Sequence, residues 1–169
     1  MQILIVDDEA PVAEVLAAAC GDAGHRVTVR TSSSDALDYM NEHQVDLLIT
    51  DIVMPPPDGL FLIREARKRN LRLVAIAITG HGLQEVVDDV VESGAHDLIV
   101  KPVRLPEFRV RVALAGERRR TLNALIERHR QLQLSSATTI SRLERELDEY
   151  RQPLGAPHVA RRLPSHSNT

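Results

Sequence analysis

The chain contains little cysteine and few aromatic residues. Its 169 residues include one cysteine, Cys20, no tryptophan and only 2% aromatic residues, whereas hydrophobic residues make up 43%. One cysteine excludes an internal disulfide and fits a reducing compartment. The chain can therefore form a hydrophobic core, but that core must be mainly aliphatic.

Signals for membranes and nucleic acids are also lacking. No apolar run approaches the ~18 residues of a membrane span, and no basic segment precedes a long apolar stretch at the N-terminus, as it would in a signal peptide. The formal net charge is -3, which gives no indication of a nucleic-acid partner. We expect a cytoplasmic protein that binds neither membranes nor nucleic acids.

Short apolar runs bounded by turn residues recur over about the first 118 residues. Runs of this kind are typical of strands that are buried on both faces of a parallel sheet. The run at 26–30 alternates polar and apolar residues, which predicts an edge strand. The five predicted strands are 2–6, 26–30, 46–50, 73–79 and 97–100.

Helical patterns separate these runs. The first helix begins near Pro11, the second follows a cap at Ser33 or Ser34, and a third runs from Gly59 to about Asn70 after a cap at Asp58. A fourth runs from about residue 83 to 92, where Gly94 stops it. Regular alternation of strands and helices predicts an α/β fold, a doubly wound parallel sheet with helices on both faces.

The chain after the last predicted strand has a different pattern. Apolar and semi-polar residues follow one another at steps of three and four, which predicts a helical, coiled-coil extension at 119–151 that continues the last helix of a domain at 1–118. The spacing fits one long helix in a parallel dimer, or two helices with a hinge near 135–139, and we favour a dimerising extension. Residues 152–169, rich in proline, serine and histidine, are expected to be disordered. The seam is Leu105, Phe108, Val112, Ala115, Arg119, Leu122, Ile126, His129, Gln133, Ser136, Ile140, Leu143, Leu147 and Tyr150.

Charged residues stand where three of the predicted strands end. Asp7 and Asp8 follow the first strand, Asp51 follows the third, and Lys101 follows the fifth. Ligands of an open parallel sheet bind outside the carboxyl ends of its strands, so these groups should converge. Three carboxylates so close repel one another unless a cation joins them, and Mg²⁺ prefers such oxygen ligands.

Phosphoryl transfer is the chemistry that this set of residues favours. Asp51 can bind the metal through one oxygen and act as nucleophile through the other. Lys101 is one of only two lysines among the 21 basic residues, and its compact ammonium can neutralise charge on a phosphoryl group. Thr79 ends the fourth strand, so its hydroxyl can donate to a phosphoryl oxygen.

The motifs resemble the receiver domain of two-component response regulators over residues 1 to about 118. They are Ile3 to Glu9 with Asp7-Asp8, Asp51 to Pro55 with Asp58-Gly59, Thr79-Gly80, and Gly94 to Asp97 leading to Lys101-Pro102. The resemblance implies a sheet order of 2-1-3-4-5 and a cis Lys101-Pro102 bond. It also implies Asp51 as phosphoacceptor, Mg²⁺ bound by Asp7, Asp8, Asp51 and the carbonyl of Val53, and Thr79 and Lys101 as phosphoryl contacts.

In such a domain a histidine kinase or a phosphotransfer protein donates the phosphoryl group. This sequence departs from the family pattern at Leu98, where the family usually has an aromatic residue or histidine that moves with the threonine. Val53 and His81, which flank the acyl phosphate in such sites, carry no carboxylate or amide to orient an attacking water. We therefore expect a long-lived phosphoryl group and weaker coupling to the face around Leu98.

Other functions remain open at this point. The output lies in another protein or in a domain that a longer chain would carry, and the downstream partner is unknown. A phosphorylation-independent scaffold of the same fold is a further alternative. An aspartyl phosphatase would need an acid where Val53 stands, and a nucleotide-binding turn would not carry three acids at Asp7 to Glu9.

Overall fold

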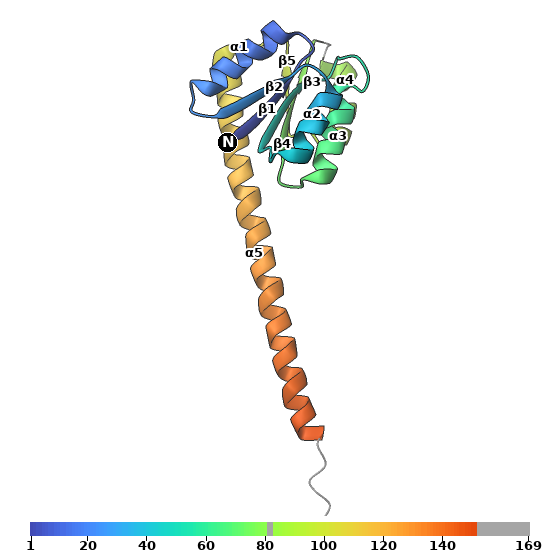
Figure 1. Cartoon of the computed structure of the whole chain (residues 1–169), viewed down its shortest axis with the longest axis vertical. Helices are drawn as coiled ribbons and strands as arrows, with labels where there is room; N and C mark the ends of the chain where they lie inside the picture. Colours follow the sequence, from blue (N-terminus) through green and yellow to red (C-terminus); the bar gives the residue numbers. More distant parts are fainter. Residues whose placement is uncertain (81–82, 152–169) are drawn as a thin grey trace, which may run out of the picture. The chain divides into compact units, whose positions relative to one another are not determined.

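The computed structural model describes the backbone of residues 1–80 and 83–151. The first unit, Met1–Ile126, is built on a five-stranded parallel sheet in the order β2-β1-β3-β4-β5 (Figure 1). This confirms the predicted α/β fold and places the alternating strand at an edge. The strands are β1 (Gln2–Val6), β2 (Arg26–Arg30), β3 (Leu47–Asp51), β4 (Val74–Thr79) and β5 (Asp97–Val100).

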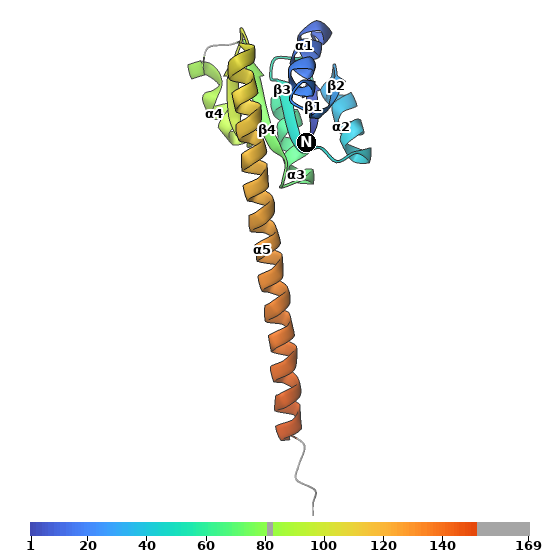
Figure 2. The same ribbon diagram turned by 90° about the vertical axis from the view of Figure 1, so that its left-hand side faces the viewer.

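Helices cover both faces of the sheet because successive strand residues point to opposite sides. In β1, Ile3 and Ile5 face α1 and the start of α5, whereas Leu4 and Val6 face the layer of α2, α3 and α4 (Figure 2). Both core clusters are almost wholly aliphatic, with Phe108 the one large aromatic side chain fully buried among the described residues. The helices are α1 (Ala10–Gly21), α2 (Ser33–Glu42), α3 (Gly59–Arg69), α4 (Leu83–Ser93) and α5 (Leu105–Arg151).

Two local predictions need correction. The cap of α2 is Ser32, whose hydroxyl accepts from the N–H of Asp35; Ser33 is buried and donates to the carbonyl of Asp58 instead. Asp51 is the last residue of β3 rather than the residue after it. The other signals are confirmed, since Asp58 caps α3 and Gly94, with φ +81°, follows α4.

The last helix runs without interruption from Leu105 to Arg151, so there is no hinge near 135–139. Its first part packs on the sheet: Phe108, Val112 and Ala115 are buried in the core cluster that α1 also lines. The first part of the predicted seam is therefore occupied within the chain. No described helix is both long and apolar enough to span a membrane, and the predicted tail at 152–169 lies outside the described residues.

Candidate metal centre

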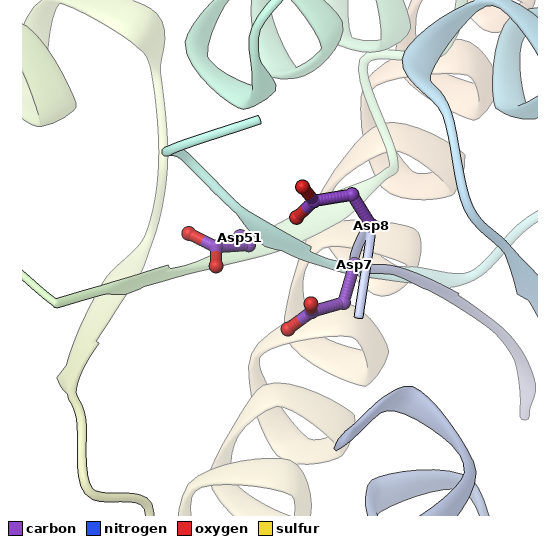
Figure 3. Close-up of side chains that lie close together, drawn as sticks. All are labelled: Asp7, Asp8 and Asp51. Atoms are coloured by element: carbon purple, nitrogen blue, oxygen red, sulfur yellow. The ribbon is translucent and has the colours of Figure 1, made fainter. Parts of the chain in front are cut away.

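Three carboxylates meet at the carboxyl ends of β1 and β3. Asp7, Asp8 and Asp51 each offer an oxygen within 4.8 Å of the others (Figure 3). The strands are neighbours, with Val6 paired to Thr50, and this register brings the three acids together. Asp7 and Asp51 are buried, whereas Asp8 is exposed, so the cluster opens to solvent on one side. A set of carboxylate oxygens of this kind fits Mg²⁺, which keeps part of its water shell.

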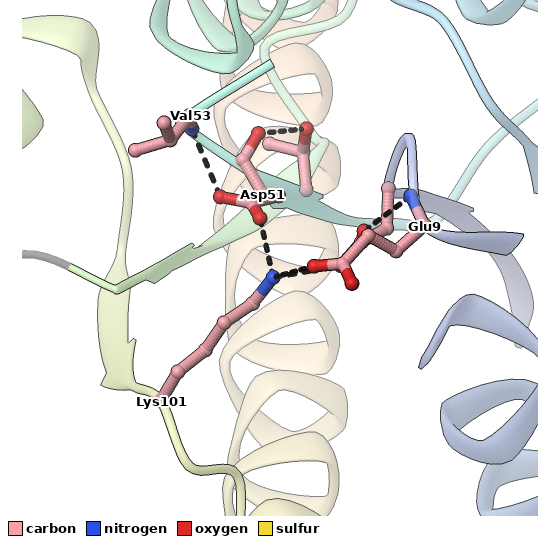
Figure 4. Close-up of polar contacts among 6 residues, drawn as sticks. Glu9, Asp51, Val53 and Lys101 are labelled. Carbon is pink, nitrogen blue, oxygen red and sulfur yellow. Dashed lines mark hydrogen bonds and ion pairs between the residues drawn. The ribbon is translucent and has the colours of Figure 1, made fainter. Parts of the chain in front are cut away.

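The ammonium of Lys101 reaches the same cluster from the end of β5. Its Nζ lies 2.5 Å from Oδ2 of Asp51, 3.3 Å from Oδ2 of Asp7 and 3.7 Å from Glu9 (Figure 4). The backbone aims this side chain, since the N–H of Lys101 donates to the carbonyl of Thr79 at 2.7 Å. The Lys101-Pro102 bond is cis, as the resemblance implies.

The pKa values of Asp7 and Lys101 are both raised, for different reasons. Burial raises the pKa of Asp7, although the N–H of Glu9 and the charge of Lys101 oppose it. Burial would lower the pKa of Lys101, but its hydrogen bond and charge pairing with Asp51, joined by Asp7, raise the pKa above its usual value. Lys101 therefore stays charged at neutral pH, and a second cation beside Asp7 would favour the charged form of that carboxyl.

The carboxylate of Asp51 is oriented through both oxygens. The N–H of Val53 donates to Oδ1 at 2.9 Å, and Lys101 holds Oδ2. The loop after β3 is anchored as well, since the N–H of Ile52 donates to the carbonyl of Ile78 on β4. Asp51 thus presents a fixed carboxylate at the rim of the sheet, as a nucleophile requires.

The remaining predicted residues lie around this rim or beside it. Thr79 is the buried last residue of β4, the strand next to β3. The side chain of Val53 is half-exposed, and Leu98 is partly buried against the core cluster beneath α3 and α4. His81 lies outside the described residues. Glu9 joins the predicted residues at this rim through its ion pair with Lys101, and its place directly after Asp7 and Asp8 is the sequence signal for it.

Comparison with known proteins agrees with this geometry. Residues 3–113 match the family model of the response regulator receiver domain. The chain belongs to that family. A receiver domain is a phosphoacceptor signalling module of two-component systems rather than a conventional enzyme, and such domains accept phosphoryl groups from histidine kinases.

Curated relatives match about two thirds of the chain. The chain is 35% identical over 113 residues to the virulence transcriptional regulatory protein PhoP of Salmonella choleraesuis, and 33% identical over 112 residues to the transcriptional regulatory protein PhoP of Escherichia coli. Each match covers 66% of this chain and 50% of the relative. The chain thus spans about half the length of the curated relatives it matches.

Solved structures resemble the receiver domain in fold and partly in sequence. TrrA of Thermotoga maritima, solved in complex with Mg²⁺-BeF, gives a TM-score of 0.62 at 27% identity over 68% of this chain and 97% of its own. NtrX of Brucella abortus gives 0.70 at 28% identity over 75% of this chain and 29% of its own. The acidic cluster of this receiver is therefore of the type that binds Mg²⁺ in the family.

Proposed function

We propose that Asp51 accepts a phosphoryl group from a histidine kinase or a phosphotransfer protein, in the cytoplasm where receiver domains act. The Asp51 carboxylate forms a P–O bond while the P–N bond of the donor's phosphohistidine breaks, and the imidazole leaves with that electron pair. The observation that carries the proposal is the convergence of Lys101 with Asp7 and Asp51, at 3.3 and 2.5 Å. An aspartate with only a structural role would not need a lysine and a second carboxylate beside it.

Residues of the site divide the work of the transfer. Asp7, Asp8, Asp51 and the carbonyl of Val53 would hold Mg²⁺, which supplies positive charge that offsets the phosphoryl oxygens. Lys101 leaves its present partners in part to neutralise the incoming group, and the Thr79 hydroxyl donates to a phosphoryl oxygen. In this scheme the protein mainly positions charges, as phosphoryl transfer requires.

The extension after the receiver carries the output in this proposal. We assign 1–118 to the receiver, 119–151 to a helical extension that self-associates or docks a partner, and 152–169 to a tail. Support comes from α5, which packs on the sheet and continues as one helix. There are two alternatives. The chain could act as a scaffold without phosphorylation, or a longer chain could carry a separate output domain.

Acetyl phosphate and Mg²⁺ test the phosphoacceptor directly. The wild-type chain should shift on phosphate-affinity electrophoresis, and Asp51→Asn should not. Asp58→Asn is the matched control because Asp58 also follows β3 but caps α3 with its side chain, a role that asparagine preserves. Phosphorylation of Asp51→Asn equal to wild type would rule out this assignment.

A further inference from the structure

The second unit of the chain, from Glu127 onward, carries an exposed apolar stripe on α5. Leu132, Ile140, Leu143 and Leu147 are each at least half-exposed. At 100° per residue, these four residues fall within an arc of about 80° on the helix, together with Ser136 among them and His129 before them. Leu134 is exposed too, but falls on the opposite face.

The spacing of this stripe is symmetric about Ser136. Leu132 and Ile140 lie four residues to either side of it, and His129 and Leu143 lie seven to either side. Leu147 lies eleven residues after Ser136. Leu125, which is also exposed, lies eleven residues before Ser136. The predicted heptad seam passes through Gln133, whereas the exposed apolar stripe passes through Leu132, so two steps of four meet at Ser136 in the stripe. The spacing of the stripe is therefore compatible with an antiparallel pair centred on Ser136, and the charges beside it decide the orientation.

Charges beside the stripe differ between its two ends. Arg128 and Arg130 flank His129, whereas Glu144 and Glu146 lie beside Leu143 and Leu147. None of these four side chains forms an ion pair with another described residue. A parallel pair aligned in register would set arginine beside arginine and glutamate beside glutamate, which is unfavourable. An antiparallel pair centred on Ser136 brings Arg128 of one copy to the level of Glu144 of the other. Arg130 then lies level with Arg142, two residues from Glu144.

We infer that a second copy of this chain covers the stripe in antiparallel orientation, with the two-fold axis at Ser136. This inference rests on the proposed self-association of the extension and specifies its partner and direction. Ser136 is small, so the helices can approach closely where they cross. Each His129 then packs at the level of a Leu143 of the other copy instead of against another His129.

Charge reversal at one end of the stripe tests the orientation in the full-length chain. The double variants Arg128→Glu with Arg130→Glu, and Glu144→Arg with Glu146→Arg, should each raise the dissociation constant about tenfold in low salt. An equimolar mixture of the two variants should associate as the wild type does, because each supplies the charges that the other lacks. Analytical ultracentrifugation measures all three.

The matched control reverses charges on the outer face. Glu127 and Arg145 lie opposite the stripe, each nine residues from Ser136, so Glu127→Arg with Arg145→Glu should leave association unchanged. Wild-type affinity in both single-end reversals would indicate a parallel pair and overturn the inference. A wild-type chain that stays monomeric at all concentrations would also overturn it.

Disulfide cross-linking gives a second measurement that needs no charged variant. In a Cys20→Ala background, Leu125→Cys mixed with Leu147→Cys should give cross-linked heterodimers, and neither variant should cross-link to itself. Self-cross-linking of Leu125→Cys would overturn the antiparallel orientation. Phosphorylation by acetyl phosphate, measured on the same samples, reports Asp51 separately, so either proposal can fail while the other stands.

Discussion

Gly59 begins helix α3 directly against the backbone of Asp51. A Cβ atom at Gly59 would lie 1.9 Å from the carbonyl oxygen of Asp51 and 2.8 Å from its carbonyl carbon. The φ angle of Gly59 is not positive, so glycine is required here for space and not for backbone conformation. The same close approach fixes the peptide of Asp51, the proposed phosphoacceptor.

Gly59→Ala should therefore disturb both stability and the site. Because the clash is with backbone, we expect a loss of about 3 kcal/mol in the free energy of unfolding, with slower phosphorylation by acetyl phosphate. Urea denaturation measures the first effect. Gly21→Ala is the control, since nothing lies within 4 Å of its added Cβ and alanine in a helix should be neutral or stabilising. Equal stability of the two variants would contradict this explanation.

Arg119 joins α5 to the opposite end of the sheet from the metal centre. Its guanidinium pairs with the carboxylate of Asp46 and donates to the carbonyl of Arg72 at 3.0 Å. Asp46 in turn accepts from the N–H of Gln2 at 2.8 Å. The Arg119 side chain is only 16% exposed, so this contact is partly desolvated and ties three segments together.

Replacing this arginine should cost much more than replacing its neighbour. Arg119→Met leaves Asp46 without its charged partner, and we expect a loss of about 2 to 3 kcal/mol, below the cost at a fully buried pair. Arg120→Met removes only an exposed pair with Glu117, worth less than about 1 kcal/mol. Urea unfolding measures the free energy of unfolding of both variants. Similar losses of this free energy would show that the Arg119 contact contributes little.

These residues show how far the sequence could predict the molecule. The strands and the acidic cluster were predictable because short apolar runs end in charged residues and parallel strands share an edge. The spacing predicts a helical seam position for Arg119, but spacing cannot show that a long side chain reaches the loops near Asp46 and Arg72. The cap of α2 was misplaced because Ser32, Ser33 and Ser34 give the same local signal.

His96 should make the receiver sensitive to acid. Its Nδ1 accepts from the N–H of Ala75, and Arg67 lies 3.1 Å from its Nε2. Burial, together with the charges of Arg67 and Arg118, lowers the pKa of His96 to about 4, against about 6.5 in an unfolded chain. A lowered folded pKa means that the unfolded state binds the proton first. Its contribution to stability is therefore complete above pH 6.5 and lost as the pH falls towards 4.

His96→Asn should reduce this loss, because the amide oxygen can still accept from Ala75 and does not titrate. Free energies of unfolding from urea melts at pH 7 and pH 5 should differ less in this variant than in the wild type. His43→Asn, on the exposed end of α2, serves as the control and should keep the wild-type difference. An unchanged difference in His96→Asn would refute the role of this histidine.

The phosphoryl group on Asp51 should persist for on the order of minutes or longer, because neither Val53 nor His81 has a carboxylate or amide to orient water. Val53 offers only an aliphatic side chain at the rim. Val53→Glu places a carboxylate there and should shorten the half-life by about tenfold through base catalysis. Val110→Glu, an exposed valine on α5, should leave it unchanged. Loss of the phosphoryl group from the wild type within seconds would contradict the expectation.

Leu98 should limit how strongly phosphorylation reaches the outer face of the receiver. It lies on β5, one strand from Thr79, and packs partly buried beneath α3 and α4. An aromatic ring at position 98 would contact more of its surroundings than leucine does. A movement of Thr79 would then shift more of the outer face of the receiver. Leu98→Tyr should therefore increase the gain in self-association that phosphorylation produces, by about fivefold at the lower end of typical coupling. Ultracentrifugation with and without acetyl phosphate measures the gain, with exposed Leu71→Tyr as control; equal gains in wild type and Leu98→Tyr would show that this position does not limit the coupling.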